Sequence, residues 1–131
     1  MSSYKKGYGL EYSIKRFLEN KGVPVIRFAG SKPADLFFKL GDEKFIAECK
    51  NVTRKEESTI YLPEDEVSKL AELASLFDAT PIVIFSFYRQ RPRVIELEDL
   101  VKVRRSFRVS KDDGTSFEKF IEVRSRSKKL L

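Results

Sequence analysis

Three side chains in two neighbouring strand-like segments have the types and spacing to handle a metal ion and a phosphate. Asp35 precedes the apolar run Leu36–Phe38, and Glu48 and Lys50 lie within Phe45–Lys50. Side chains alternate along a strand, so Glu48 and Lys50 share one face. Two carboxylates beside an ammonium group are typical of a divalent-metal nuclease. The alternative is a solvated strand face with an ordinary Glu–Lys pair, and the spacing alone does not decide between the two.

The amino-acid composition limits the catalytic mechanisms and metal sites that the chain can form. The 131 residues include no histidine and a single cysteine. This excludes Ser-His-Asp and Cys-His mechanisms and zinc sites ligated by histidine. Cys49 alternates to the apolar face of its strand, which favours a packed thiol over a nucleophile. Any metal would be held mainly by oxygen atoms, which favours Mg²⁺, and we expect Mn²⁺ to substitute for it.

The charge distribution favours a polyanionic partner. The formal net charge is +6; residues 124–131 contribute +4 of it, which leaves +2 for residues 1–123. A second basic region runs from Arg89 to Lys111. Binding through such groups releases counterions, so it should depend strongly on salt. No apolar run approaches the roughly 20 residues that span a bilayer, and we see no signal peptide, so we expect a cytoplasmic protein without a membrane partner.

The pattern of apolar residues predicts one α/β domain with a central mixed sheet flanked by helices. We expect a single domain over 1–123, in which 1–9 form a mobile arm, and a basic tail at 124–131 that either contacts DNA or is disordered. Glu11 falls at the edge of the apolar stripe of the first predicted helix. The predicted helices cover 8–21 and a segment opened by Pro63; the predicted strands cover 23–28, 36–40, 44–51, 60–62, 81–87, 94–95 and 101–109, and the segment 117–123 is open between helix and strand.

The second predicted helix carries a wide apolar surface. Leu73 and Leu76 extend its stripe beyond what one face of a sheet would cover, and Phe77 lies in the stripe itself. Burial between layers would explain this width, and so would a subunit interface.

Several of these residues together resemble a known family. Glu11 on a helix, then Arg27-Phe28-Ala29-Gly30-Ser31 with Asp35 four residues later, then Glu48-Cys49-Lys50, are similar to the archaeal Holliday junction resolvases. These belong to the PD-(D/E)xK, or restriction-endonuclease-like, superfamily of nucleases. The resemblance extends over roughly residues 7–87 and is faint beyond them.

The resemblance implies a role for each matching residue. Glu11, Asp35 and Glu48 would bind or orient Mg²⁺, and Lys50 would lie beside the attacking water and the phosphate. Arg27 matches a position used near the phosphate. Ser31 matches a serine of the active-site loop in one branch of the family. The chain departs from the family at Tyr12, where many members have a basic residue, so one expected phosphate contact is in doubt.

The resemblance also implies an activity and partners. The expected activity is Mg-dependent hydrolysis that makes paired nicks in four-way DNA junctions during recombination or repair, by a homodimer joined through Leu73, Leu76 and Phe77. The arm and a flap at 53–59 would reach the junction. Candidate DNA contacts are Lys5, Lys6, Arg27, Lys32, Arg54 and Lys55. The alternatives are a related endonuclease for duplex, flap or mismatched DNA, a non-catalytic DNA-binding module, and a dimeric interaction protein.

Overall fold

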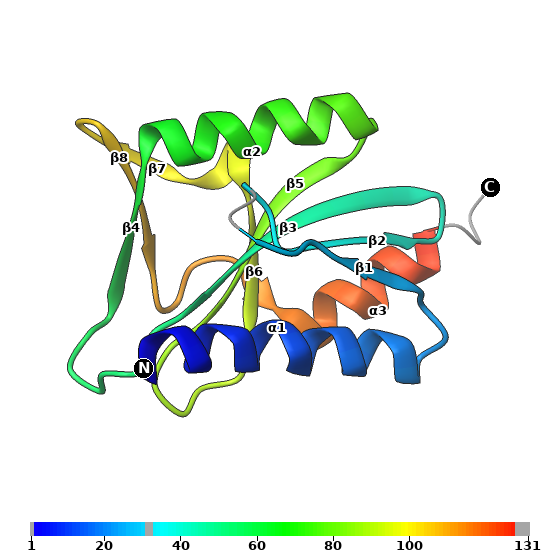
Figure 1. Ribbon diagram of the computed structural model, residues 1–131, viewed down its shortest axis with the longest axis horizontal. Coiled ribbons are helices and arrows are strands. Elements are labelled where there is room, and N and C mark those ends of the chain that lie inside the picture. The colour runs from blue at the N-terminus through cyan, green and yellow to red at the C-terminus, as the bar shows by residue number, and fades with distance from the viewer. Residues whose placement is uncertain (1, 31–32, 128–131) are drawn as a thin grey trace.

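The computed structural model describes the backbone of residues 2–30 and 33–127, and the side chains of residues 9–126 within these ranges (Figure 1). Helices alternate with short strands, as the sequence pattern predicts. In chain order the elements are α1 Ser2–Asn20, β1 Val25–Arg27, β2 Leu36–Leu40, β3 Glu43–Asn51, β4 Thr59–Pro63, α2 Glu64–Phe77, β5 Thr80–Ser86, β6 Arg93–Glu96, a short 3-10 helix Leu97–Asp99, β7 Val101–Val103, β8 Ser106–Ser110, β9 Thr115–Ser116 and α3 Phe117–Ser127.

The main sheet is mixed, which confirms the prediction. Its strand order is β1-β2-β3-β5-β6-β9, in which β3 and β5 are parallel and the other neighbours are antiparallel. The hairpin between β2 and β3 turns at Gly41, whose φ of 59° suits glycine. The parallel pair requires a crossover, and β4 with α2 provides it.

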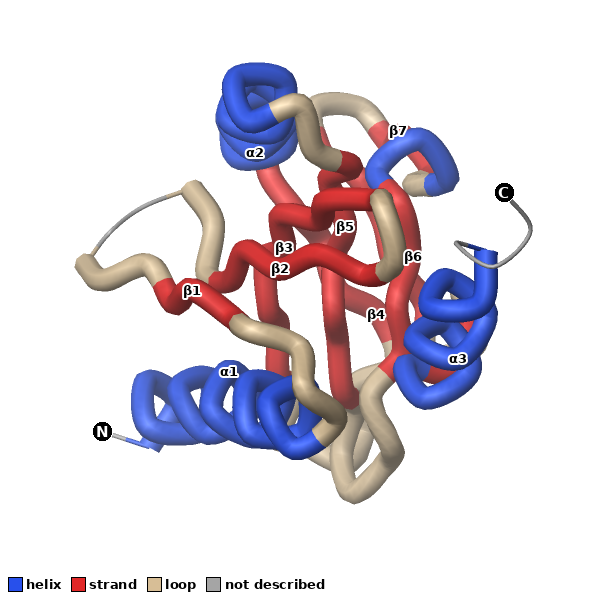
Figure 2. Tube along the Cα trace, turned by 90° about the vertical axis from the view of Figure 1, so that its right-hand side faces the viewer, coloured by secondary structure: helices blue, strands red, loops and turns tan. Residues whose placement is uncertain are grey.

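The two faces of the main sheet are covered by different elements (Figure 2). Helices α1 and α3 pack on one face, where Ile14 and Phe120 join a core cluster with Phe45 of β3. Helix α2 packs on the other face, where Leu70 and Ala74 cluster with Ile46 of β3. Strand β3 therefore lies in the middle of the molecule, with helices on both sides of it.

A second, three-stranded sheet in the order β4-β8-β7 was not foreseen. The pattern predicts one strand over 101–109, but Arg104 adopts a φ of 57° and turns the chain, so the segment forms the hairpin of β7 and β8. Strand β4 pairs antiparallel with β8. Leu62 and Val109 on the inner face of this small sheet cluster with Phe85 of the main sheet.

Both ends of the chain are more helical than predicted. Helix α1 begins at Ser2, so the expected arm at 1–9 is mostly helical; its mobility stays a prediction. Helix α3 continues to Ser127, and its Phe117 and Ile121 are buried in the main core. The open segment 117–123 is therefore helical, and the helix continues past residue 123, where the domain boundary stays a prediction. Residues 128–131 of the predicted tail lie outside the described residues. No described helix is long and apolar enough to cross a membrane.

Candidate active site

Asp35 lies where the pairing of β2 with β3 ends. The last pair is Leu36 with Ala47, whereas β3 continues to Asn51. The backbone N–H of Asp35 donates to the Ala47 carbonyl at 2.8 Å, and its carbonyl accepts from the Phe28 N–H at 2.9 Å. Its Oδ2 accepts from the backbone N–H of Cys49 at 2.7 Å. The carboxylate thus takes the place of a strand partner, and these three bonds fix it beside β3.

The two faces of β3 carry the residues that the alternation predicts. Phe45, Ala47 and Cys49 are buried on the face that α1 covers. Burial, followed by the nearby charge of Asp35, raises the pKa of the Cys49 thiol well above its usual range. This confirms that Cys49 is a packed thiol, because the reactive thiolate is disfavoured there.

Helix α1 contributes Glu11, which pairs with Arg27 of β1. Arg27 Nε donates to Glu11 Oε1 at 3.1 Å, and both side chains are largely buried. The guanidinium also lies over the ring of Tyr12, 5.8 Å from its centroid. Tyr12 therefore contacts the arginine at the position where a second basic residue is expected in the family.

Lys50 lies between two carboxylates. Its Nζ is 3.3 Å from Glu48 Oε2 and 3.1 Å from Glu66 Oε1 in the first turn of α2. Glu66 is one of three acids in the first turn of α2, where acids commonly oppose the positive end of a helix, so its position in the sequence does not reveal this contact. Burial lowers the pKa of Lys50, but the charges of Glu48 and Glu66 outweigh it and raise the pKa above its usual value.

The carboxyl groups of this site hold their protons unusually strongly. Burial, and then repulsion from Asp35, raises the pKa of Glu48 to about 8. Burial, and then the charge and hydrogen bonding of Asp35, raises the pKa of Glu11 to about 7 in spite of Arg27. Asp35 thus contributes to the raised pKa of both Glu11 and Glu48. Four acidic groups surround two cations here, so the site has a surplus of acidic groups.

The carboxylates of Glu11, Asp35 and Glu48 are suitable ligands for an oxygen-binding divalent cation. In this structure, however, Glu11 and Glu48 point toward the neighbouring cationic side chains. Among the described residues, no three His, Cys, Asp or Glu side chains are already grouped closely enough to hold a metal ion. Glu48 is directed to Lys50 and Glu11 to Arg27. A cation beside Asp35 would neutralise the surplus charge, and Glu48 and Glu11 would have to rotate toward it.

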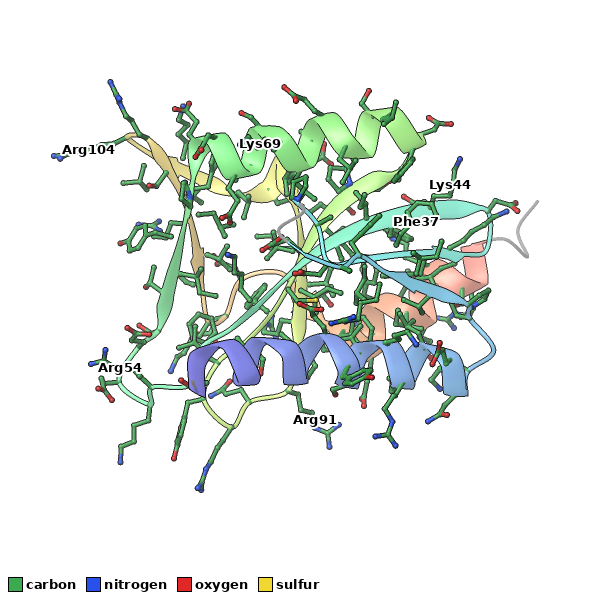
Figure 3. The ribbon with its side chains drawn as sticks, viewed as in Figure 1. Phe37, Lys44, Arg54, Lys69, Arg91 and Arg104 are labelled. Atoms are coloured by element: carbon green, nitrogen blue, oxygen red, sulfur yellow. The ribbon has the colours of Figure 1, made fainter. Side chains whose placement is uncertain are left out.

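The other predicted site residues are only partly placed. Ser31 and Lys32 lie outside the described residues, and the side chains of Lys5 and Lys6 on α1 are not described. Arg54 is on the loop after β3, is 70% exposed, and lies 3.6 Å from Glu56 (Figure 3). The neighbouring Lys55 is also exposed. The structure therefore brings together Glu11, Arg27, Asp35, Glu48 and Lys50, with Arg54 and Lys55 at the periphery.

The apolar surface of α2 is partly covered by other residues of the same chain. The Phe77 ring lies 5.3 Å from that of Phe37 and 6.3 Å from that of Phe28. Leu73 is partly buried against the core, whereas Leu76 is 76% exposed. Leu76 is thus the member of this surface that the chain itself leaves most open.

Known proteins share both the sequence and the fold. A family model described as "Archaeal holliday junction resolvase (hjc)" matches residues 2–129. The crossover junction endodeoxyribonuclease Hjc of Methanocaldococcus jannaschii is 34% identical over 84 residues, which are 64% of this chain. That match spans 61% of the relative's length.

Two solved structures share most of the fold. The Holliday junction resolvase Hjc of Archaeoglobus fulgidus has a TM-score of 0.77 and 26% identity, over 89% of this chain and 96% of that one. The bacterial homing endonuclease I-Ssp6803I has a TM-score of 0.61 over 97% of this chain and 96% of that one; its 9% identity shows a common fold alone. The restriction-endonuclease-like fold class is thereby confirmed. With a family match over nearly its whole length, the chain belongs to the archaeal Holliday junction resolvase family.

Proposed function

We propose that this protein is a structure-selective endodeoxyribonuclease that cuts four-way DNA junctions by metal-dependent hydrolysis. Family membership supports this substrate. The observation that carries the chemistry is the group of carboxylates around Asp35, in which Glu11 and Glu48 have raised pKa values. A divalent cation would offset both the burial of these carboxylates and their mutual repulsion, and it would displace their protons on binding.

Asp35 and Glu48 would hold the ion, and Glu11 would bind it directly or through water. Bound there, Mg²⁺ would lower the pKa of a water molecule and offset charge on the phosphate. Mg²⁺ is the ion that an all-oxygen donor set favours, and we expect Mn²⁺ to substitute. Asp35 is suited to the central position because its Oδ2 is held by the Cys49 N–H.

The two cations of the site would act on the phosphate. Lys50 carries a fixed positive charge next to Glu48, where negative charge grows during in-line attack. Arg27 has a planar guanidinium that can bind two phosphate oxygens at once. Its pairing with Glu11 keeps this group beside a carboxyl group that also interacts with Asp35.

DNA would be gripped through its backbone on either side of this centre. Arg54 and Lys55 on the loop after β3 are exposed and suit phosphate contacts. Lys5, Lys6 and Lys32 remain predicted contacts. Contacts to phosphate read the shape of a junction and carry little sequence information. Binding should therefore weaken steeply with added salt.

A homodimer would give two such centres for two opposite strands. The exposed Leu76 on α2 supports an interface there, with Leu73 and Phe77 beside it. Substituting Leu76 by Glu places a charge in this interface, and we expect the protein to become monomeric in sedimentation experiments. Tyr61→Glu is a matched control, because Tyr61 is 59% exposed on the small sheet. A Leu76→Glu protein that stays dimeric would contradict the interface.

A cleavage assay tests the function directly. A synthetic four-way junction with each strand labelled in turn is incubated with and without Mg²⁺, beside its component duplexes. We expect paired nicks in the junction only with the metal. Equal cutting of the duplexes would indicate a different endonuclease. Salt-sensitive binding without any nick would indicate a DNA-binding module, and no binding at all would indicate an interaction protein.

A further inference from the structure

We infer that Glu66 is a positioning residue, which shares the ammonium group of Lys50 with Glu48 and would hold it in place when Glu48 binds the metal. The inference rests on the proposed function and goes beyond it, because it adds a residue of α2 to a site built from α1, β1, β3 and the segment before β2. Lys50 Nζ lies 3.1 Å from Glu66 Oε1, which is slightly closer than its 3.3 Å to Glu48 Oε2.

The contact is buried on the side of Glu66. Its Oε1 is inaccessible to solvent and accepts no hydrogen bond of good geometry among the described residues, so the ion pair with Lys50 is its main compensation there. A buried carboxylate oxygen needs such a partner, because its loss of hydration is otherwise uncompensated. The ion pair therefore fixes the Glu66 carboxylate as well as the Lys50 ammonium group.

The other two acids of the same helical turn differ from Glu66. Glu64 pairs with Lys102 of β7 at 2.5 Å, on the small sheet. Asp65 is exposed. All three oppose the positive end of α2, but Glu66 alone among them contacts the site. Helix α2 is fixed on the sheet by the buried Leu70 and Ala74, so its first turn is a firm support for this contact.

The two carboxylates compete for one ammonium group. If Lys50 paired with Glu48 alone, it would neutralise a proposed metal ligand and would itself be drawn from the phosphate. A carboxylate bound to a cation interacts less strongly with a nearby ammonium group, so Glu66 would then be the anion that keeps Lys50 in place. The positions of both functional groups of β3 thus depend on a residue from another element.

The test compares Glu66→Gln, Glu66→Asp and the matched control Asp65→Asn. Single-turnover cleavage of a four-way junction is measured with Mg²⁺, and junction binding is measured without it. We expect Glu66→Gln to slow cleavage roughly 10- to 100-fold, the size of a lost charge-assisted contact, with unchanged binding. Glu66→Asp should recover part of the rate, and Asp65→Asn should cleave at the wild-type rate.

A double-mutant cycle with Lys50→Ala shows whether Glu66 acts through Lys50. In that background we expect Glu66→Gln to have no further effect on cleavage. A Glu66→Gln protein that cleaves at the wild-type rate overturns the proposal. So does an equal loss in both backgrounds, since a general effect on the fold would not require Lys50.

A second readout is independent of cleavage. In ¹H–¹⁵N spectra of lysine ammonium groups without DNA or metal, a held Lys50 should exchange its protons with water slowly. Glu66→Gln should speed this exchange, and Asp65→Asn should not. Unchanged exchange in Glu66→Gln overturns the proposal. If the wild-type protein cuts no junction, the proposed function fails, while this spectrum still decides on the Glu66–Lys50 contact.

Discussion

The two ends of β3 each carry a cation held between two carboxylates. At the start of the strand, Arg124 of α3 donates to Glu43 at 2.8 Å and also hydrogen bonds to Glu96 of β6. Near its other end, Lys50 lies between Glu48 and Glu66. Both groups are partly buried and draw on elements from distant parts of the chain. The roles that we expect of the two groups nevertheless differ.

The difference lies in how the charges are balanced. Arg124 forms hydrogen bonds with both of its carboxylates and lies over the rings of Phe45 and Phe120, at 5.4 and 4.9 Å from their centroids. Burial lowers the pKa of Arg124, but its hydrogen bonds with Glu96 and Glu43 outweigh this and raise it. The charges of Arg124, Glu43 and Glu96 are paired with one another, and we expect this cluster to stabilise the fold without taking part in catalysis.

Around Lys50 the charges are not balanced. Asp35 adds a carboxylate that is fixed by backbone hydrogen bonds, and burial followed by the charge of Asp35 raises the pKa of both Glu48 and Glu11. A cluster that resists its own ionisation stores repulsion that a bound cation would relieve. The comparison shows that the proposed site differs from a structural salt bridge by a surplus of acidic groups, even where the residue types are the same.

The largest expected effect comes from removing that surplus. Glu48→Gln and Asp35→Asn should each lower Mg²⁺-dependent cleavage by at least about 10²- to 10³-fold, since each removes a charge that acts on the transition state. Junction binding should persist, because it depends on contacts to phosphate elsewhere. Glu43→Gln on the same strand is the matched control. Full activity in Glu48→Gln or in Asp35→Asn would refute the metal assignment.

A smaller effect is expected at the structural end of β3. Arg124→Met keeps the apolar stem and leaves Glu43 and Glu96 without their partner, which should lower the free energy of unfolding by about 1–3 kcal/mol. Denaturant unfolding measures it. Cleavage below the unfolding transition should match the wild type. Arg91→Met, whose pair with Glu118 is exposed, should change stability little. Loss of cleavage in stably folded Arg124→Met would contradict the proposal that the Arg124 end of β3 is structural and the Lys50 end is catalytic.

A third expected effect is a dependence of stability on pH. The folded protein keeps a proton on Glu48 up to a pKa of about 8, whereas the unfolded chain releases it near 4.5. The folded state therefore holds more protons between these values, and this contribution to stability falls as the pH rises through that window. Thermal unfolding of the metal-free protein should show the decline, and Glu48→Gln should make it shallower. Identical slopes in the two proteins would mean that the Glu48 carboxyl is not perturbed.

Much of the fold and half of the site followed from the sequence. Alternation along β3 separated Glu48 and Lys50 from Cys49, because a strand has a strict period of two. The small sheet did not follow, because its turn at Arg104 uses a left-handed conformation that the residue type does not favour. Glu66 could not be assigned either, since its contact with Lys50 depends on how α2 packs across the sheet and on no local pattern.

Diffraction from crystals containing Mn²⁺ tests the central claim most directly. The anomalous signal of the metal locates the ion without reference to activity. We predict a peak bound by Asp35 and Glu48, with Glu11 coordinated directly or through water, and no peak beside Glu43 and Glu96. The peak should be absent in crystals of Glu48→Gln grown under the same conditions. A peak that persists in Glu48→Gln, or one that lies at Arg124 instead, would contradict the account.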